Sequence, residues 1–348
     1  MTDSKTDIDK ELSQFRQRYH QLNEYIRANN IPPDWFTDNQ IILSHGPMRV
    51  RRFKGPAGQH PPVLIVYSHV NAPNVIDLHG RHSMVQRLIE CGHTVYLLDW
   101  GKISEGDREN DLSMYVDDYI DAAVDCIRNE SNIEKINLLG ICQGGTFSLC
   151  YASLKPDKIN RLVTMVTPVD FHAGDSILSH WVKYIDFSIL EKKPRNVPGA
   201  VITSLFQIIR PFNDLQRQVQ LIDQPLHSGR LELTTLMDQW VFHCPDQPGR
   251  AFAQFINWFF QENRLVKNSL VLGDAEISLS NITAPVFNVF AEHDHLVPAA
   301  SASALADYIP EDLYQQQVFA GGHIGLMVSE KAQQTILPRI GRWLAGLN

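Results

Sequence analysis

The stretch 136-INLLGICQGGTFSLCYASLK-155 decides the fold. It begins with an apolar run of strand length and ends in a helix-like run. Between them, Gly140-Ile-Cys-Gln-Gly144 has the spacing of the G-x-S-x-G nucleophile elbow, with Cys142 at the nucleophile position. Glycines at 140 and 144 would keep side chains out of such a sharp turn. The segment therefore predicts a reactive thiol where a strand turns into a helix. The alternative is an incidental glycine-rich turn with a buried cysteine.

Apolar runs of strand length recur on both sides of this elbow. They are nearly continuous, which is typical of strands buried on both faces, and they lie at 63–68, 94–99, 136–141, 161–166, 286–291 and 315–319. Helix-like segments alternate with them, at about 81–91, 112–129, 145–155, 299–308 and 329–345. This alternation predicts an α/β protein with a mostly parallel central sheet covered by helices on both sides.

The alternation stops between Pro168 and about Leu279, a region rich in aromatic residues. Helix-like pieces lie there at roughly 176–190, 199–210 and 248–263, so we expect an inserted, mostly helical cap over 168–279. The core would comprise 31–167 and 280–348. Most cap aromatics would simply fill the cap interior, but some are expected to line an apolar tunnel or to contact an apolar product.

Residues 1–30 are expected to form an amphipathic helix, most of it within 4–29. Its apolar residues recur at steps of 4, 3, 4, 3 and 4, at Ile8, Leu12, Phe15, Tyr19, Leu22 and Ile26. Two interpretations stay open: the helix lies on its own domain, or its stripe is a seam for a partner helix.

Composition narrows the class of protein. The 348 residues carry a formal net charge of −8, which argues against a general nucleic-acid binder. The five cysteines are odd in number and lack C-x-x-C spacing, and no H-E-x-x-H pair occurs, so we expect no disulfide framework and no metal site. The polar N-terminus shows no secretory signal, and no apolar run approaches 18 residues. We therefore expect a cytoplasmic protein with no transmembrane segment.

A nucleophile on an elbow needs a base and an orienting acid at the same edge of the sheet. Asp294 follows the run 286–291 within 292-EHDHLVP-298, and His323 follows 315–319 within 320-AGGHIG-325. Both would lie at carboxyl ends of strands, as Cys142 does. We expect His323 to take the thiol proton, and Asp294 to fix the tautomer of His323 or to help activate a second substrate.

Two backbone donors are expected to hold the oxyanion. The first is the Gln143 N–H at the start of the helix. The second would come from the loop 68-SHVNAPNVI-76, with the N–H of Val70 or Asn71 as the best candidates. An ordinary turn set by Asn-Ala-Pro is the alternative for this loop.

The choice of cysteine bears on the reaction. A thiolate suits exchange with a thioester, because the acyl group keeps nearly the same energy on the enzyme and can be passed on to a hydroxyl group. Acyl transfer is therefore favoured over hydrolysis, although cysteine hydrolases with such an elbow exist.

Several strings together resemble one family. They are 63-VLIVYSHVNAPNVIDL-78, 93-HTVYLLDWG-101, 138-LLGICQGGTF-147, 161-RLVTMVTPVDF-171, 240-WVFHCPDQPG-249, 290-FAEHDHLVP-298 and 320-AGGHIGL-326. The chain resembles the catalytic subunit, PhaC, of class III polyhydroxyalkanoate (PHA) synthases, which have the α/β-hydrolase fold. Family members usually carry a basic and an aromatic residue where this chain has Ala72 and Asn74.

The resemblance implies an acyltransferase that polymerises short (R)-3-hydroxyacyl-CoA, such as 3-hydroxybutyryl-CoA, into polyester and releases CoA. Cys142 would carry the growing chain, His323 would be its base, and Asp294 would assist. The CoA thioester is substrate, so no cofactor is implied. The resemblance also implies a second, noncatalytic subunit of the PhaE type, a homodimer of this chain, and a place at the surface of cytoplasmic polyester granules.

Two rival functions stay open at this point. One is a cysteine thioesterase or esterase of the same fold, which differs only in using water as acceptor. The other is a noncatalytic granule-associated scaffold protein that uses the apolar cap and the N-terminal seam.

Overall fold

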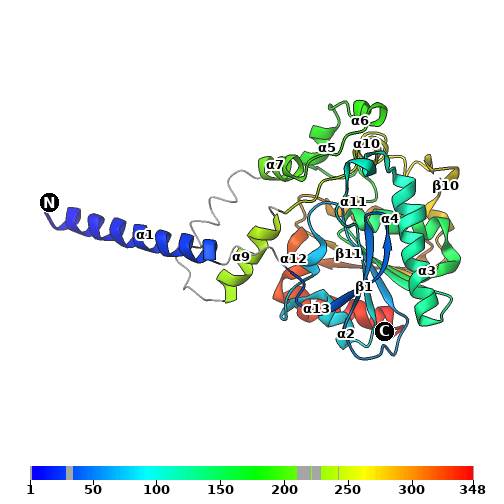
Figure 1. The fold of residues 1–348 in the computed structure, drawn as a ribbon, viewed down its shortest axis with the longest axis horizontal. Helices are drawn as coiled ribbons and strands as arrows, with labels where there is room; N and C mark the ends of the chain where they lie inside the picture. Colours follow the sequence, from blue (N-terminus) through cyan, green and yellow to red (C-terminus); the bar gives the residue numbers. More distant parts are fainter. Residues whose placement is uncertain (1, 29–33, 210–220, 222–228, 242, 348) are drawn as a thin grey trace.

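The computed structural model describes residues 2–28, 34–209, 221, 229–241 and 243–347, and its centre is a single eight-stranded sheet (Figure 1). The strand order is β1-β2-β6-β3-β7-β8-β11-β12. The strands are β1 (Asn39–His45), β2 (Met48–Phe53), β3 (Val63–Val66), β6 (Val95–Asp99), β7 (Ile136–Ile141), β8 (Ile159–Met165), β11 (Val286–Ala291) and β12 (Tyr314–Phe319).

Six of these strands, from β6 through β12 in the sheet order, run parallel to one another, and they coincide with the six apolar runs. The prediction of a mostly parallel α/β sheet is therefore confirmed. The sequence pattern missed β1 and β2, which pair antiparallel at one edge. No residue of β1 is fully buried, and β2, which reads MRVRRF, mixes buried and partly exposed positions, so neither strand forms a continuous apolar run.

Helices cover both faces of the sheet because successive strand residues point to opposite sides. Leu64 and Val66 of β3 pack in the cluster that contains α3 and α4, whereas Val63 and Ile65 pack in the cluster that contains α2 and α13. The core helices are α2 (Met84–Glu90), α3 (Ile120–Ser131), α4 (Gln143–Leu154), α11 (Ala299–Ser303), α12 (His323–Val328) and α13 (Glu330–Leu344). Short elements complete the core: η1 (Pro73–Ile76), β4 (Asp77–His79), β5 (His82–Ser83), η2 (Glu105–Glu109), η3 (Met114–Tyr119), η4 (Pro156–Lys158), η6 (Leu279–Asn281), η7 (Ala304–Asp307) and η8 (Glu311–Leu313).

Between β8 and β11 the chain leaves the sheet and forms a mostly helical segment above it (Figure 1). Its elements are α5 (Ile177–Val182), α6 (Ser188–Lys192), α7 (Gly199–Ile209), α9 (Gly229–Val241), α10 (Gly249–Phe255), the π-helical turn η5 (Ile256–Gln261) and the hairpin of β9 (Leu270–Leu272) and β10 (Ala275–Ile277). We call this segment, 168–279, the cap. Two of its aromatic residues, Phe212 and Phe242, lie outside the described residues.

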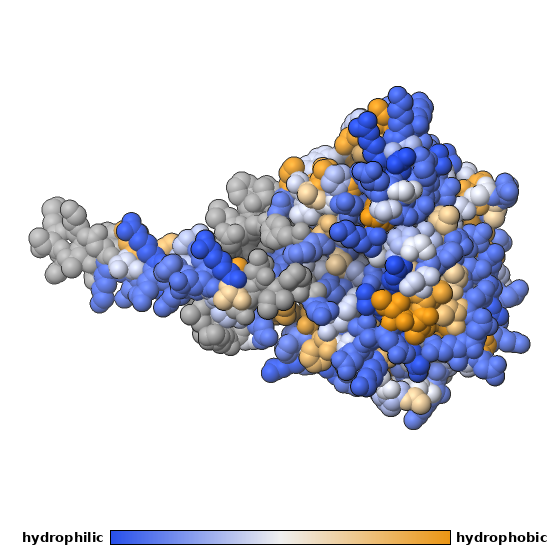
Figure 2. Space-filling view, viewed as in Figure 1, coloured by the Kyte–Doolittle hydropathy of each residue, from blue (hydrophilic) through white to orange (hydrophobic). Residues whose placement is uncertain are grey.

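Helix α1 (Thr2–Ala28) projects away from the rest of the molecule, as Figures 1 and 2 both show. Among the described side chains of α1, Leu22 in the last turns packs with Leu221 and with Leu231 of α9. Leu12, Phe15 and Tyr19 are about half exposed. The apolar stripe of α1 therefore stays largely uncovered within this chain. No helix in the described ranges is both long and apolar enough to cross a membrane.

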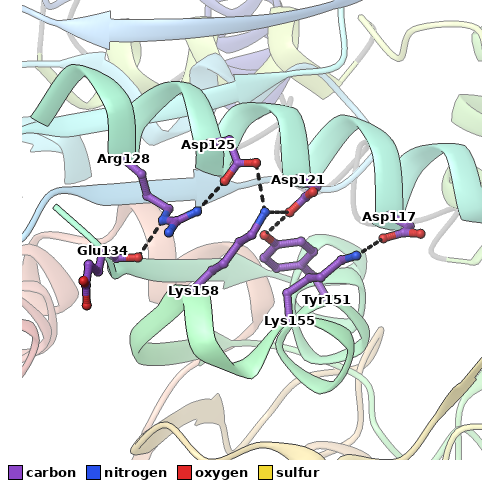
Figure 3. Close-up of polar contacts among 8 residues, drawn as sticks. All are labelled: Asp117, Asp121, Asp125, Arg128, Glu134, Tyr151, Lys155 and Lys158. Carbon is purple, nitrogen blue, oxygen red and sulfur yellow. Dashed lines mark hydrogen bonds and ion pairs between the residues drawn. The ribbon is translucent and has the colours of Figure 1, made fainter. Parts of the chain in front are cut away.

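A network of ion pairs ties α3 to the far end of α4, the helix that starts at the elbow (Figure 3). The Lys158 ammonium donates to Asp121 at 2.7 Å and to Asp125 at 2.9 Å, and the Tyr151 hydroxyl also donates to Asp121. Arg128 donates to Asp125 at 2.6 Å. These partly buried bonds fix α4 against α3 at the end opposite Cys142.

Candidate active site

Cys142 lies in the sharp turn between β7 and α4, with a backbone φ of 54° and ψ of −125°. Such a left-handed φ is unfavourable for a non-glycine residue and is typical of strained functional turns. Close packing explains the glycine at 144, since a Cβ there would lie 2.2 Å from the Val66 carbonyl oxygen. A Cβ at Gly140 would lie 2.5 Å from the Gly145 Cα. The elbow therefore presses directly against the end of β3.

The thiol lies at the amino end of α4, whose first residue is Gln143. The first N–H groups of a helix have no partner within the helix, and the helix dipole makes this end positive. Both effects favour a thiolate at 142 and a negative oxygen beside it. This arrangement is the one expected for a nucleophile whose Gln143 N–H faces an oxyanion.

His323 and Asp294 are brought together at the same edge of the sheet. The His323 Nδ1 donates to the Asp294 carboxylate at 2.7 Å, and both side chains are buried. The other carboxylate oxygen of Asp294 accepts the N–H groups of Leu296 and Val297, each at 2.9 Å. His323 is also hydrogen-bonded to Cys142. The structure thus joins the three residues in the order Cys142, His323, Asp294. His323 is the first residue of helix α12.

The surroundings of His323 favour its charged form. Burial alone would lower the pKa of His323, but the negative charge of an ionised Cys142 and the Asp294 carboxylate outweigh it and raise the pKa to about 10. The charged imidazolium of His323 is thus favoured, and it lies where it can stabilise a negative charge on the Cys142 sulfur.

The loop after β3 holds both candidates for the second oxyanion donor. In this structure the Val70 N–H donates to the Ser68 hydroxyl at 2.8 Å, and the Asn71 N–H donates to the Cys244 sulfur at 3.5 Å. Val70 and Asn71 line the same cavity as Cys142. Either N–H can donate to an oxyanion only after its present hydrogen bond breaks.

A cavity of about 1020 Å³ opens above Cys142, His323 and Gln143. Its walls come mostly from apolar side chains of the cap, including the aromatic residues Trp181, Tyr184, Phe187, Phe206, Trp240, Phe252, Phe255 and Phe260. By contrast, Trp258 and Phe259 pack in the core cluster beneath. The volume suits a substantial apolar ligand.

Comparison with known proteins identifies the family. A family model described as the alpha/beta hydrolase fold matches residues 61–330. A "Poly(3-hydroxyalkanoate) polymerase subunit PhaC" from Allochromatium vinosum is 41% identical over 88% of this chain and 87% of that protein. A protein of the same name from Synechocystis sp. is 40% identical over 89% of this chain and 85% of that protein. The chain belongs to the PhaC family.

Membership in the PhaC family makes the chain an enzyme of poly(3-hydroxyalkanoate) synthesis. A more distant PhaC, from Haloarcula marismortui, is 32% identical over 96% of this chain and 71% of that protein. Solved structures agree on the fold alone. A putative lipase from Acinetobacter baumannii is 15% identical with a TM-score of 0.52 over 94% of this chain and 95% of that one. Epoxide hydrolase A from Mycobacterium thermoresistibile is 14% identical with a TM-score of 0.53, over 90% of this chain and 99% of that one.

Sequence reasoning missed part of this PhaC site. Tyr67 directly follows β3 and lines the cavity together with Cys142. Burial raises the pKa of Tyr67, and negative charge on Cys142 or Cys244 raises it further. Trp240, Cys244 and Gln247 contact the loop after β3 from the cap. The string 240-WVFHCPDQPG-249 was the one signal that pointed to them.

In the described part of the chain, no three or more His, Cys, Asp or Glu side chains form a group that could hold a metal ion. His293 and His295, which flank Asp294, are exposed and line the cavity mouth. His69 is buried with its ring beside Trp100 and Tyr115. Burial lowers the pKa of His69 to about 3, so this ring is neutral.

Proposed function

We propose that this chain is the catalytic subunit of a class III PHA synthase, which polymerises short (R)-3-hydroxyacyl-CoA through a thioester on Cys142 and releases CoA. The observation that carries the proposal is the hydrogen-bonded series of Cys142, His323 and Asp294 at the floor of a large apolar cavity. The family assignment supplies the polymer class. The arrangement of Cys142, His323 and Asp294 supports acyl transfer through a thioester.

In the first half of the reaction the Cys142 thiolate attacks the acyl-CoA carbonyl carbon. The oxyanion is held by the Gln143 N–H and by one N–H of the loop after β3. When the tetrahedral intermediate collapses, the bond to the CoA sulfur breaks and the imidazolium of His323 gives its proton to the leaving thiolate. The acyl group remains on Cys142, and His323 is left neutral and ready to act as a base.

In the second half a 3-hydroxyl group takes the place of CoA. His323 removes the proton from the hydroxyl, the oxygen attacks the acyl thioester, and an ester bond forms as the Cys142 sulfur leaves. Both oxygens of Asp294 are already engaged, by His323 and by two backbone N–H groups. We therefore assign Asp294 the role of holding and charging the imidazole rather than that of contacting the hydroxyl.

Water must be kept from the acyl thioester, because hydrolysis would end the chain. The mostly apolar walls of the cavity favour a polyester chain over water. This feature supports a synthase over a thioesterase with the same three residues.

The partners belong to the same proposal. The uncovered stripe of α1 suits a helix of a second, PhaE-type subunit, because its 4-3 spacing is that of a coiled-coil seam. We further propose that two copies of this chain form the working unit and that it acts in the cytoplasm at the surface of the polyester granule.

The test is to incubate the protein with (R)-3-hydroxybutyryl-CoA, with and without the second subunit, and to follow CoA release and products together. Insoluble polyester with CoA release supports the synthase. Free 3-hydroxybutyrate without polymer supports a thioesterase. No CoA release from the wild type, with a granule phenotype unchanged by Cys142→Ala, supports the scaffold.

A further inference from the structure

The loop after β3, residues 68–72, is held firmly on the side that faces the core. Gln143 Oε1 accepts the His69 N–H at 3.0 Å and the Ser68 hydroxyl at 3.4 Å. The His69 ring packs edge-on against Trp100 at 4.6 Å and Tyr115 at 4.3 Å between ring centroids. The residue that follows the nucleophile therefore fixes the first half of this loop.

The cap holds the same loop from the opposite side. The Gln247 side-chain amide donates to the His69 carbonyl at 3.2 Å, and the Trp240 indole N–H donates to the Ala72 carbonyl at 2.6 Å. Between these two bonds the Cys244 sulfur accepts the Asn71 N–H at 3.5 Å. We call Trp240, Cys244 and Gln247 the cap clamp.

The cap clamp is connected to the wall of the cavity. Gln247 and Val197 exchange two backbone hydrogen bonds, at 2.8 and 2.9 Å, and the Asp246 carboxylate accepts the Gly199 N–H at 2.9 Å. Gly199 begins α7, whose side chains face the cavity at Ile202, Thr203, Leu205 and Phe206. Movement of α7 against a ligand in the cavity would therefore be passed to the loop after β3.

The two candidate donors on this loop are held with unequal strength. Val70 donates to a hydroxyl oxygen at 2.8 Å, which is a strong local bond. Asn71 donates to a sulfur at 3.5 Å, and sulfur is a weak acceptor. A negatively charged oxygen is a far better acceptor than a thiol. Replacing the present acceptor with an oxyanion therefore costs little at Asn71, which donates to the Cys244 sulfur, and more at Val70, which donates to the Ser68 hydroxyl.

We propose that the cap clamp positions the second oxyanion donor, and that this donor is the Asn71 N–H, which Cys244 holds weakly until the oxyanion forms. Gln247 and Trp240 would hold the loop in place beside Cys142. Cys244 would compete with the oxyanion for the hydrogen bond from the Asn71 N–H. The inference rests on the proposed acyl transfer at Cys142 and adds the cap residues that tune it.

Two reactions of the Cys142 thiol distinguish an effect on the position of the oxyanion loop from a general disturbance of the active site. Acylation of Cys142 by 4-nitrophenyl butyrate, followed as the single-turnover release of 4-nitrophenol, passes through an oxyanion. Alkylation by iodoacetamide, quantified by mass spectrometry on the peptide that contains Cys142, has no oxyanion. A change in the first rate with no change in the second therefore reports on the oxyanion donors.

Gln247→Ala removes the bond to the His69 carbonyl and is expected to slow acylation on the order of tenfold without slowing alkylation. Cys244→Ala removes the competing acceptor and is expected to speed acylation about twofold. Cys126→Ala, on α3 and away from the site, is the matched cysteine control and should change neither rate. Trp240→Phe keeps an aromatic side chain but loses the indole N–H donor. This variant replaces Gln247→Ala in the test if Gln247→Ala does not fold.

The proposal is overturned if Gln247→Ala or Trp240→Phe leaves acylation unchanged or slows both reactions alike. It is also overturned if Cys244→Ala slows acylation, because Cys244 would then support the donor instead of competing with it. Failure of the proposed function looks different. A wild type that is acylated by the ester but releases no CoA from (R)-3-hydroxybutyryl-CoA would contradict the synthase and leave the cap clamp standing.

Discussion

Asp294 and His323, 29 residues apart in the sequence, are joined by a 2.7 Å hydrogen bond in which the imidazole donates and the carboxylate accepts. The remaining carboxylate oxygen accepts the N–H groups of Leu296 and Val297, so the side chain is fixed on both sides. We expect a carboxylate held in this way to act on the reaction through the imidazole. Its effect should therefore appear in the titration of the Cys142–His323 pair.

Asp294→Asn should lower the turnover rate by at least about tenfold and change its pH dependence. The Asp294 carboxylate favours the imidazolium, so its removal lowers the pKa of His323, which now lies at about 10. A less charged imidazole would then stabilise a negative charge on the Cys142 sulfur less well. Iodoacetamide alkylation of Cys142 should fall near pH 7 and recover at alkaline pH.

Asp312→Asn is the control for this variant, because Asp312 is exposed and lies away from the site. Its pH profile should follow that of the wild type. An Asp294→Asn protein that is alkylated with the wild-type pH profile would show that the carboxylate does not charge the imidazole.

Gly144→Ala should damage the fold as well as the reaction. The added methyl group would lie 2.2 Å from the Val66 carbonyl oxygen, so the elbow and the end of β3 must move apart. We expect a loss of about 2 kcal/mol or more in the free energy of unfolding, measured by urea denaturation. Gly229→Ala should be close to neutral, because no atom of the described residues, apart from its neighbours in the chain and helix, lies within 4 Å of the new Cβ. Equal stabilities of the two variants would contradict the close packing at the elbow.

The sequence was sufficient to predict the central sheet because its buried strands are continuous apolar runs. It was insufficient at β1 and β2, where arginines at 49, 51 and 52 hide the strand pattern. These side chains lie on β2, the strand next to the edge, and Arg51 pairs with Asp99 of the neighbouring strand β6 at 2.7 Å. Such long-range pairing leaves no local signature in the sequence.

The active site shows the same difference between local sequence patterns and long-range contacts. The elbow at Cys142 has a local sequence signature, because a tight turn restricts the residues within it. The hydrogen bonds from Gln247 to His69 and from Trp240 to Ala72 join residues 178 and 168 positions apart, and no spacing rule predicts them. Sequence reasoning therefore proposed Cys142, His323 and Asp294 but not the cap residues that hold the loop beside them.

Asp125→Asn tests the ion-pair network behind α4. Partial burial would raise the pKa of Asp125, but Lys158 and Arg128 outweigh it and lower the pKa below its ordinary value of 3.8. A lowered folded-state pKa adds stability above pH 3.8, and that stability is lost as the pH falls through the folded pKa. Since Asp125 is 43% exposed, we expect the variant to lose at most about 1 kcal/mol at pH 7.

This difference between wild type and Asp125→Asn should shrink as the pH falls below 3.8 and through the lowered folded-state pKa of Asp125, as followed by urea denaturation at a series of pH values. Asp38→Asn removes a carboxylate that pairs with Lys54 at 3.6 Å with both side chains about 80% exposed, and should have no measurable effect. A pH-independent loss in Asp125→Asn would point to packing instead of charge.

The stripe of α1 can be tested without disturbing the active site. Changing Leu12, Phe15 and Tyr19 together to Gln should abolish co-purification with the second subunit, because these half-exposed side chains form the apolar seam. Acylation of Cys142 should be unchanged, since none of these three side chains is among the described residues that line the cavity above Cys142.

The matched control changes Lys10, Gln17 and Gln21, on the opposite side of α1, to Ala and should keep the partner bound. Retention of the partner by the Leu12, Phe15 and Tyr19 variant would rule out the stripe as its binding surface.

The most direct test of the account is to trap the acyl group on the enzyme. The wild type is mixed with (R)-3-hydroxybutyryl-CoA, quenched in acid within a single turnover, and its cysteine peptides are analysed by mass spectrometry. The account predicts a 3-hydroxybutyryl thioester on Cys142, at a yield that matches the CoA released and that is lost in Cys142→Ala. CoA released while Cys142 stays unmodified at every quench time, or released equally fast by Cys142→Ala, would contradict it.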